Sequence, residues 1–437
     1  MDQPPRYKCL LFGAKQVVQV TSAPDVRLVK GRDMSAVKVL SQDPQSQHGY
    51  SIVIGLDGVI VEIGVDSDVA STYCNCTFES KIDVTGKVVL PGLVDAHSHP
   101  VFAGDRVHEF ALKLAGATYM QVHQAGGGIH FTVEKTRAAD EEELLQDFVQ
   151  LANKMCRSGT TLLEAKSGYG LNWETERKML TVLERAKSVI PLEISSTFCG
   201  AHAIPKDSTA DQFTQEIVEE QLVALKAEME AGRLKVENID VFCEQGVFSV
   251  QQSRSILEKG KQLGLSLNFH GDELHPTGSA ELGGQLSATA VSHLEHISEE
   301  GMRAMAGSES VAVVLPTTAY ILRLKPTPVR KMIESGMAVA LGSDFNPNAY
   351  CYAMPLVMHL ACVLFGMSLE EALVAATVNA AASLNRGHSH GTLHPGRQGD
   401  LIIIDAPRWE HLVYQLGCHE HLICAVVKGG HLVYSKS

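Results

Sequence analysis

The chain has 437 residues, 45% of them hydrophobic, and a formal net charge of −13. This length suits one large domain plus a smaller one, and the acidic balance argues against nucleic acid as a partner. The sequence has neither the roughly 18-residue apolar run of a membrane span nor a signal-peptide pattern after Met1. Ten cysteines lack the spacing of a disulfide framework, so we expect a cytoplasmic globular protein with free thiols.

Both ends of the chain predict β structure. Residues 7–20 contain a strand, and Ser51–Gly64 holds two strands around a Leu-Asp-Gly turn, which is typical of a hairpin. Near the other end, Gly399–Asp405 predicts a strand and Ile423–Tyr434 a hairpin with a Gly-Gly turn. The polar stretch 41–49 is expected to be a mobile insertion.

The middle of the chain alternates short β-branched runs with longer amphipathic segments. The expected strands are Val88–Asp95, Thr160–Ala165, Leu192–Phe198, Asn238–Cys243, Leu265–Phe269, Thr289–Ser292, Val311–Leu315 and Ala338–Gly342. Helical patterns between them include Asp140–Ser158, Glu174–Ser188, Asp211–Glu230 and Val250–Leu263. Eight alternations over roughly 250 residues are the pattern of a (β/α)₈ barrel.

The predicted fold is therefore an α/β protein: a (β/α)₈ TIM-like barrel at residues 88–389, with a small β-sandwich domain formed from both termini, residues 1–87 and 390–437. The rival architecture is an open doubly wound sheet, which usually carries a glycine-rich phosphate turn after its first strand. Here the first predicted strand of the middle region ends in His97-Ser98-His99, which favours the barrel.

The pair His97 and His99 is the first candidate for chemistry. Alternate side chains of a strand point to one face. Two imidazoles two residues apart at a strand end therefore provide half of a tetrahedral metal site. The alternative interpretation is two unrelated surface histidines.

Polar residues follow three further predicted strands, as His270-Gly271-Asp272-Glu273, His293-Leu294-Glu295-His296 and Ser343-Asp344-Phe345-Asn346. Catalytic groups of a barrel sit at the carboxyl ends of its strands. A single buried histidine is most often a packed core residue. Four strand ends at one rim, all with metal-ligand chemistry, are hard to explain by packing.

Three imidazoles and one carboxylate make the expected metal site, from His97, His99, His270 and Asp344. Three or four protein ligands with room for water are the catalytic arrangement of Zn²⁺ and similar ions. Such a metal lowers the pKa of its water to about 7.

Proton transfer needs a second carboxylate that does not bind the metal. Glu273 is expected to take the water proton and return it to the leaving nitrogen. His293 is expected to orient the water or to polarise the substrate carbonyl. For Asp272 and Glu295 we expect only a supporting role or a solvated position.

These motifs resemble the amidohydrolase superfamily and, within it, the imidazolonepropionase family. The segments that carry the resemblance are Pro91–His99, Ala125–Ile129, Lys166–Leu171, Gly200–His202, His270–Glu273 and Gly342–Pro347. The resemblance implies hydrolysis of the cyclic amide of 4-imidazolone-5-propanoate to N-formimidoyl-L-glutamate, in the degradation of L-histidine to L-glutamate. It also implies one Zn²⁺ or Fe³⁺ per subunit on the four ligands above, Asp344 among the catalytic residues, and a homodimer.

The resemblance assigns substrate binding to Arg106, Tyr169, His202, Glu273 and Asn346. A planar guanidinium grips a carboxylate, such as a propionate, through two parallel hydrogen bonds. The chain departs from the family's pattern after Asn-Pro, where it has Asn348 and Ala349 in place of the glycine usual in bacterial relatives.

Other functions remain open at this point. A nucleobase deaminase or another cyclic amidase would use the same motifs, and a non-catalytic scaffold would be expected to lose metal ligands. A nucleotide-binding oxidoreductase is disfavoured because no Gly-x-Gly-x-x-Gly follows the first predicted strand of the middle region. Lys166 follows strand two, not the strand four where a carboxylated lysine bridges two metals in some superfamily members, so one metal is expected.

Overall fold

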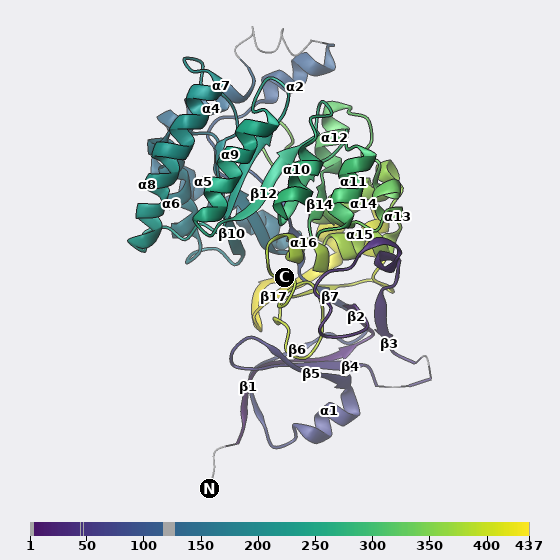
Figure 1. The fold of residues 1–437 in the computed structure, drawn as a ribbon. Coiled ribbons are helices and arrows are strands. Elements are labelled where there is room, and N and C mark those ends of the chain that lie inside the picture. The colour runs from purple at the N-terminus through teal and green to yellow at the C-terminus, as the bar shows by residue number, and fades with distance from the viewer. Residues whose placement is uncertain (1–3, 44, 47, 117–126, 437) are drawn as a thin grey trace.

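A computed structural model describes residues 4–43, 45–46, 48–116 and 127–436. Its larger part is a ring of eight parallel strands in the order β8 to β15 (Figure 1). These strands are β8 Leu93–Asp95, β9 Thr160–Lys166, β10 Glu193–Ala201, β11 Asn238–Cys243, β12 Ser266–Gly271, β13 Ala290–His293, β14 Val311–Val314 and β15 Ala338–Leu341. The predicted barrel is confirmed.

Backbone hydrogen bonds join the residues that follow β8 to those at the end of β15, so the first and last strands of this sheet lie side by side. The Ala96 amide donates to the Leu341 carbonyl at 3.3 Å, and the Asp344 amide donates to the His97 carbonyl at 2.9 Å. Two residues far apart in sequence, His97 and Asp344, are therefore neighbours at the carboxyl end of the barrel.

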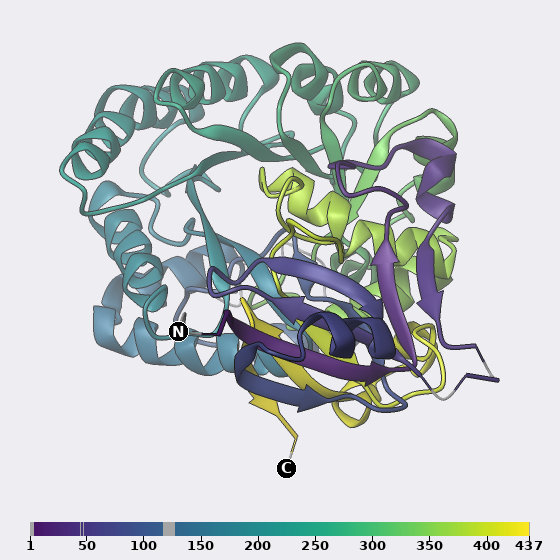
Figure 2. The ribbon, with the colours of Figure 1, turned by 90° about the horizontal axis from the view of Figure 1, so that it is seen from below.

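Helices surround the barrel, as the view from below shows (Figure 2). Among the described residues, the α-helices of the whole molecule are α1 Asp66–Thr72, α2 Val107–Leu114, α4 Ile129–Ala138, α5 Glu141–Arg157, α6 Trp173–Ala186, α7 Ala210–Glu216, α8 Leu222–Glu230, α9 Val250–Gln262, α10 Ser279–Leu286, α11 Glu299–Ala306, α12 Pro316–Leu322, α13 Val329–Glu334, α14 Met354–Phe365, α15 Leu369–Ala375, α16 Val378–Ser383, α17 His411–Tyr414 and α18 His419–Leu422. A 3₁₀ turn spans Gly31–Ser35, and a π-helical turn, Ile217–Gln221, joins α7 to α8.

Helix α5 shows why these segments are helical. The Asp140 side chain accepts a hydrogen bond from the Glu143 amide, which caps the first turn. Leu144, Phe148 and Leu151 then recur at helical spacing and are buried. The helix therefore covers the barrel with one apolar face.

The two chain ends form two sheets beneath the barrel, visible as the purple and yellow strands of Figure 1. One sheet has the order β5-β4-β1-β6, and the other β18-β17-β16-β7-β2-β3. Their strands are β1 Arg6–Ala14, β2 Gln16–Val20, β3 Lys38–Ser41, β4 Tyr50–Ile54, β5 Ile60–Val65, β6 Thr77–Asp83, β7 Val88–Pro91, β16 Leu401–Ile404, β17 Ile423–Lys428 and β18 His431–Ser435. Both predicted hairpins pair antiparallel as expected.

One core joins the two sheets. Leu11 and Ile52 from the first sheet and Val89 and Ile403 from the second belong to the same buried cluster. The predicted sandwich built from both termini is confirmed. The predicted insertion at 41–49 includes residues 44 and 47, which lie outside the described residues.

The predicted first barrel strand, Val88–Asp95, is wrong as a single element. Its first half, β7, pairs with β16 and β2 in the terminal sheet, and only its second half, β8, pairs with β9 in the barrel. The chain changes sheet at Gly92, where a Cβ would lie 2.1 Å from the Thr161 Oγ1 atom. The domain boundaries after residues 87 and 389 stay predictions, although β7 belongs by its pairing to the terminal sheet.

No helix in the described parts of the chain is both long and apolar enough to cross a membrane.

Candidate metal centre

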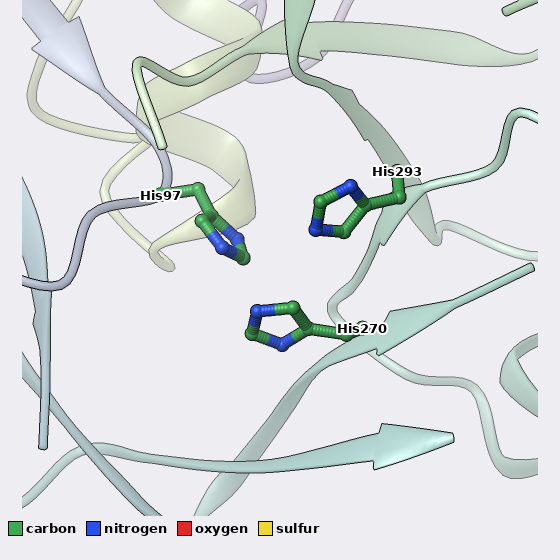
Figure 3. Close-up of side chains that lie close together, drawn as sticks. All are labelled: His97, His270 and His293. Carbon is green, nitrogen blue, oxygen red and sulfur yellow. The ribbon is translucent and has the colours of Figure 1, made fainter. Parts of the chain in front are cut away.

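Histidines from three barrel strands face one another at the carboxyl end of the barrel (Figure 3). The ring centre of His270 lies 4.5 Å from that of His97 and 5.2 Å from that of His293. One nitrogen of each of the three lies within 4.8 Å of the others. His97 is far in sequence from the consecutive strands β12 and β13 that carry His270 and His293, so the closure of the barrel brings the three rings together.

The two other predicted ligands lie beside this cluster. The Nε2 atoms of His99 and His270 are 3.2 Å apart. The Asp344 Oδ1 atom lies 3.5 Å from His97 Nε2 and 3.8 Å from His99 Nε2. The fold thus brings all four predicted ligands, His97, His99, His270 and Asp344, into direct proximity.

Burial keeps the imidazoles of His97 and His99 neutral, and metal binding requires the neutral form. It lowers the pKa of His97 and of His99 well below the ordinary value. His97 Nδ1 lies 2.8 Å from the Ser292 hydroxyl, and His270 Nδ1 lies 2.9 Å from the Asp240 carboxylate. Nε2 of both rings therefore faces the cluster.

The donor set fits a metal ion. His97 Nε2 is buried and has no hydrogen-bond partner among the described residues. A buried nitrogen without a partner costs free energy unless something else binds it. Neutral imidazoles beside a carboxylate are ligands that zinc and iron accept. His202 and His293 also take part in groups that satisfy the same distance criterion, so the choice of His97, His99, His270 and Asp344 stays a prediction.

Backbone strain marks the same rim. His293 and Asp344 both adopt left-handed backbone conformations, with φ of 78° and 47°. Such conformations cost roughly 1–3 kcal/mol each for residues other than glycine and concentrate at functional sites. The strain at Asp344 is accompanied by a hydrogen bond of 2.5 Å from the Thr318 hydroxyl to its Oδ2 atom.

Glu273 and His293 lie within reach of one another. Glu273 Oε2 is 3.6 Å from His293 Nε2. Burial, reinforced by the Glu295 and Asp344 carboxylates, raises the pKa of Glu273 well above its ordinary value. Burial lowers the pKa of His293 to about 3. Their predicted roles in proton transfer stay predictions.

For Asp272 and Glu295 we expected a supporting role or a solvated position, and the solvated position is wrong because both are buried. Asp272 is buried and accepts hydrogen bonds from the Thr277, Gly278 and Ala280 amides, so it supports the start of α10. Glu295 is 2% exposed, and burial raises its pKa to about 8. A charged residue after an apolar strand does not reveal on its own whether it turns toward water.

Two predicted substrate residues lie against the histidines. The His202 ring stacks on the His99 ring at 4.6 Å and 9°, and its Nδ1 is 3.0 Å from the Gly168 carbonyl. Burial lowers the pKa of His202 to about 4. The buried Tyr169 ring lies 5.9 Å from that of His99. Both therefore lie close enough to contact a molecule at the metal centre.

Arg106 is set farther out, beside a cavity of about 810 Å³. Phe102, which also lines this cavity, has its ring 6.1 Å from that of Tyr169. The rings of Phe102 and Tyr169 thus connect the cavity wall to His99, and no histidine is among the described residues that line the cavity. Most of its lining is apolar, with Arg106, Asp105, Arg323 and Asn348 as polar exceptions.

Asn346 is engaged within its own loop. Its Nδ2 donates to the Asp344 carbonyl at 2.7 Å, and its Oδ1 accepts from the Asn348 and Ala349 amides at 2.7 and 3.1 Å. The side chain shapes the segment after Asp344, and its contact with substrate stays a prediction.

Sequence reasoning missed Asp240, Ser292 and Thr318. A signal existed for Asp240, because a charged residue within the apolar run Asn238–Cys243 demands a buried partner. Ser292 and Thr318 are ordinary hydroxyl residues in their segments, and only the fold shows what they contact.

This fold and this site define a metal-dependent hydrolase barrel, and the comparisons agree. Residues 88–430 match the Amidohydrolase family. The chain belongs to this family.

Relatives over nearly the whole chain are more specific. A "Probable imidazolonepropionase" of Nematostella vectensis is 57% identical over 423 residues, covering 97% of this chain and 98% of that protein. One from Mus musculus is 55% identical over 430 residues, covering 98% and 99%.

Solved structures show the same fold at much lower identity. A zinc-bound adenosine deaminase from Xanthomonas campestris has a TM-score of 0.69 and 17% identity, with 98% of this chain and 93% of that chain covered. Escherichia coli guanine deaminase has a TM-score of 0.68 and 16% identity, with 98% and 99% covered.

Proposed function

We propose that the chain hydrolyses the cyclic amide bond of 4-imidazolone-5-propanoate to give N-formimidoyl-L-glutamate, a step in the degradation of L-histidine to L-glutamate. The observation that carries the proposal is the convergence of imidazoles and a carboxylate at one barrel rim, with His99 and His270 nitrogens 3.2 Å apart. The relatives named above support the choice of substrate.

His97, His99, His270 and Asp344 would hold one Zn²⁺ or Fe³⁺ per subunit. When bound, such a metal supplies Lewis acidity and lowers the pKa of water to about 7. The protein supplies the dry, rigid surroundings: all four side chains are at most 6% exposed.

Glu273 and His293 handle the proton. Glu273 takes a proton from the water molecule as this water adds to the carbonyl carbon of the ring. The carbon–nitrogen bond then breaks, and Glu273 returns the proton to the departing nitrogen. His293, 3.6 Å from Glu273, donates to the developing oxyanion or orients the water.

The remaining site residues bind the substrate. Arg106 pairs with the propionate, and Tyr169 and His202 contact the ring from the side of His99. Asn346 contributes at the end that becomes the glutamate product. In this arrangement the scissile bond points toward the histidine cluster.

The decisive experiment is incubation of the purified protein with imidazolone propionate, following the loss of ultraviolet absorbance with and without a chelator. We expect turnover that the chelator abolishes and added Zn²⁺ or Fe restores. Guanine and adenosine serve as controls, and we expect no ammonia from either. Release of ammonia without loss of imidazolone absorbance would favour a deaminase; a metal-free protein without any activity would favour a scaffold.

We also propose that the enzyme is a cytoplasmic homodimer that binds neither nucleic acid nor membranes. All ten cysteines are free thiols, in keeping with a reducing compartment. Sedimentation equilibrium of the purified protein tests the dimer, and cell fractionation tests the compartment.

A further inference from the structure

A buried lysine lies directly behind the histidine cluster. Lys166, the last residue of β9, has a fully buried side chain. Its Nζ atom is 2.8 Å from Glu164 Oε1 and 2.8 Å from Asp240 Oδ2. A buried ammonium is costly unless it is paired, so two carboxylates at this distance indicate a fixed charge cluster.

This charge cluster contacts a predicted metal ligand. Besides facing the lysine, the Asp240 carboxylate lies 2.9 Å from His270 Nδ1 and accepts a hydrogen bond of 3.1 Å from the His270 amide. A carboxylate at Nδ1 keeps the proton there and leaves Nε2 free to bind a metal. Asp240 thus contacts both Lys166 and His270 and links the lysine to the predicted ligand.

The same strand end also supports the histidine pair. The Lys166 amide donates to the Ser98 carbonyl at 3.0 Å, and the Ser98 hydroxyl donates to the Glu164 carbonyl at 2.6 Å. Ser98 lies between His97 and His99. The end of β9 therefore braces ligands from two other strands.

We propose that Lys166 is a positioning residue of the metal centre: its ammonium holds the Asp240 carboxylate in the orientation that directs His270 Nε2 at the metal. The inference rests on the proposed metal-dependent function. It also explains the charge of this lysine. A carboxylated lysine would place a third negative group beside Glu164 and Asp240, whereas an ammonium offsets one of their two negative charges.

The test is the metal affinity of Lys166→Met, which removes the charge while keeping an unbranched apolar side chain of similar length. We expect zinc to bind about 10- to 100-fold more weakly than to the wild type, measured by competition with a chromophoric chelator. Unchanged affinity in the folded variant would overturn the proposal.

Lys428 provides the matched control. It is a lysine that is 18% exposed and has two carboxylate partners, Glu193 at 3.1 Å and Asp400 at 2.6 Å. Glu193 begins β10, so this group lies at the opposite end of the barrel from the histidine cluster. Lys428→Met should lower the free energy of unfolding and leave the zinc affinity unchanged. An equal loss of zinc affinity in both variants would show that Lys166 acts only on global stability.

Lys166→Gln covers the case in which the Met variant does not fold. It keeps hydrogen-bond donors for Glu164 and Asp240 but carries no charge, and we expect zinc affinity to fall in the same direction. The outcome is independent of the proposed reaction. Zinc binding weakened by the variants, in a protein that leaves imidazolone propionate intact, would retain this inference and reject the substrate.

Discussion

Arg106 reaches the cavity with its guanidinium already fixed. Its Nε and Nη2 atoms donate to the Glu109 carboxylate at 2.7 and 2.6 Å, and Glu109 also accepts the Gly128 amide at 2.7 Å. Glu109 is 1% exposed. A guanidinium held in one orientation loses little entropy when it binds a second carboxylate, which favours tight recognition of a propionate.

Replacement of Arg106 by lysine should therefore impair substrate binding more than chemistry. A point charge cannot pair with Glu109 and the propionate in the same geometry, so we expect KM for imidazolone propionate to rise about 10- to 100-fold, with a smaller change in kcat. Steady-state kinetics measure both constants. Arg323→Lys, a change in the lining of the same cavity, is the control and should behave as wild type. An unaltered KM in Arg106→Lys would remove the carboxylate clamp from the mechanism.

A substitution of Glu273 distinguishes the loss of proton transfer from the loss of metal binding. Glu273→Gln keeps the shape but cannot accept a proton, so we expect kcat to fall about 10²- to 10⁴-fold. Metal content should stay at the wild-type level because Glu273 is not among the predicted ligands. Metal analysis and kinetics on the same preparation check both statements; a parallel loss of metal would instead make Glu273 a ligand.

The predicted ligands could be placed at one rim from the sequence because each lies at the carboxyl end of a barrel strand, and parallel strands present these ends at the same rim. His97, His270 and Asp344 are 173 and 74 residues apart in sequence, yet the order of strands alone brings them together. The groups that hold them were less accessible to prediction. Thr318 lies in the first turn of α12 and contacts Asp344 only because the chain folds back there.

At the scale of elements, Gly92 is the point at which the chain leaves one sheet for another. The position has no room for a methyl group, since a Cβ would lie 2.1 Å from Thr161 Oγ1 and 2.5 Å from its Cγ2. Gly92→Ala should therefore lower the free energy of unfolding by about 2–3 kcal/mol, as overpacking of a dense core does. Urea denaturation measures the change.

A second substitution tests the cause. Thr161→Ala removes the two nearest clashing atoms and leaves the Thr161 Cβ at 2.8 Å, so we expect the double variant to recover part of the stability that Gly92→Ala loses. If the losses of unfolding free energy in the two single variants simply added up in the double variant, the destabilisation by Gly92→Ala would not come from contact with Thr161.

The apolar pattern of the sequence could not show that the segment from Val88 to Asp95 is divided into β7 and β8, which belong to different sheets. Every residue from Val88 to Val94 is buried, because β7 and β8 are both covered on two faces. A continuous buried run predicts a strand but does not say which sheet it joins. The other seven barrel strands were predicted to within a few residues because turns or helices bound each of them.

At the scale of the whole molecule, four charged groups join the barrel to the terminal sheets. Glu193 begins β10, while His390, Asp400 and Lys428 come from the C-terminal part of the chain. His390 Nε2 lies 3.1 Å from Glu193 and 3.3 Å from Asp400, and Lys428 contacts both carboxylates. We call this set of contacts, in which Glu193 of the barrel meets His390, Asp400 and Lys428, the seam. Its stability depends on the ionisation of these side chains.

The pKa shifts define the pH range in which this seam is strongest. Burial opposes ionisation of His390, but hydrogen bonds to Asp400 and Glu193 outweigh it and raise its pKa above 6.5. Burial also opposes ionisation of Glu193 and Asp400, yet Lys428 and His390 hold the pKa of each below its ordinary value. The carboxylates thus stabilise the fold above their ordinary pKa values, and this contribution is lost in acid.

His390 contributes in the opposite sense. Because its folded pKa is raised, its stabilisation is fully present below about pH 6.5 and is lost as the pH rises through the folded value. We therefore expect His390→Gln to be less stable than wild type at pH 6 and the difference to shrink steadily toward pH 9. Urea denaturation of both proteins across this range gives the two curves. A difference that widened with pH would mean that His390 acts in the seam as a neutral hydrogen-bonding group and not as a cation.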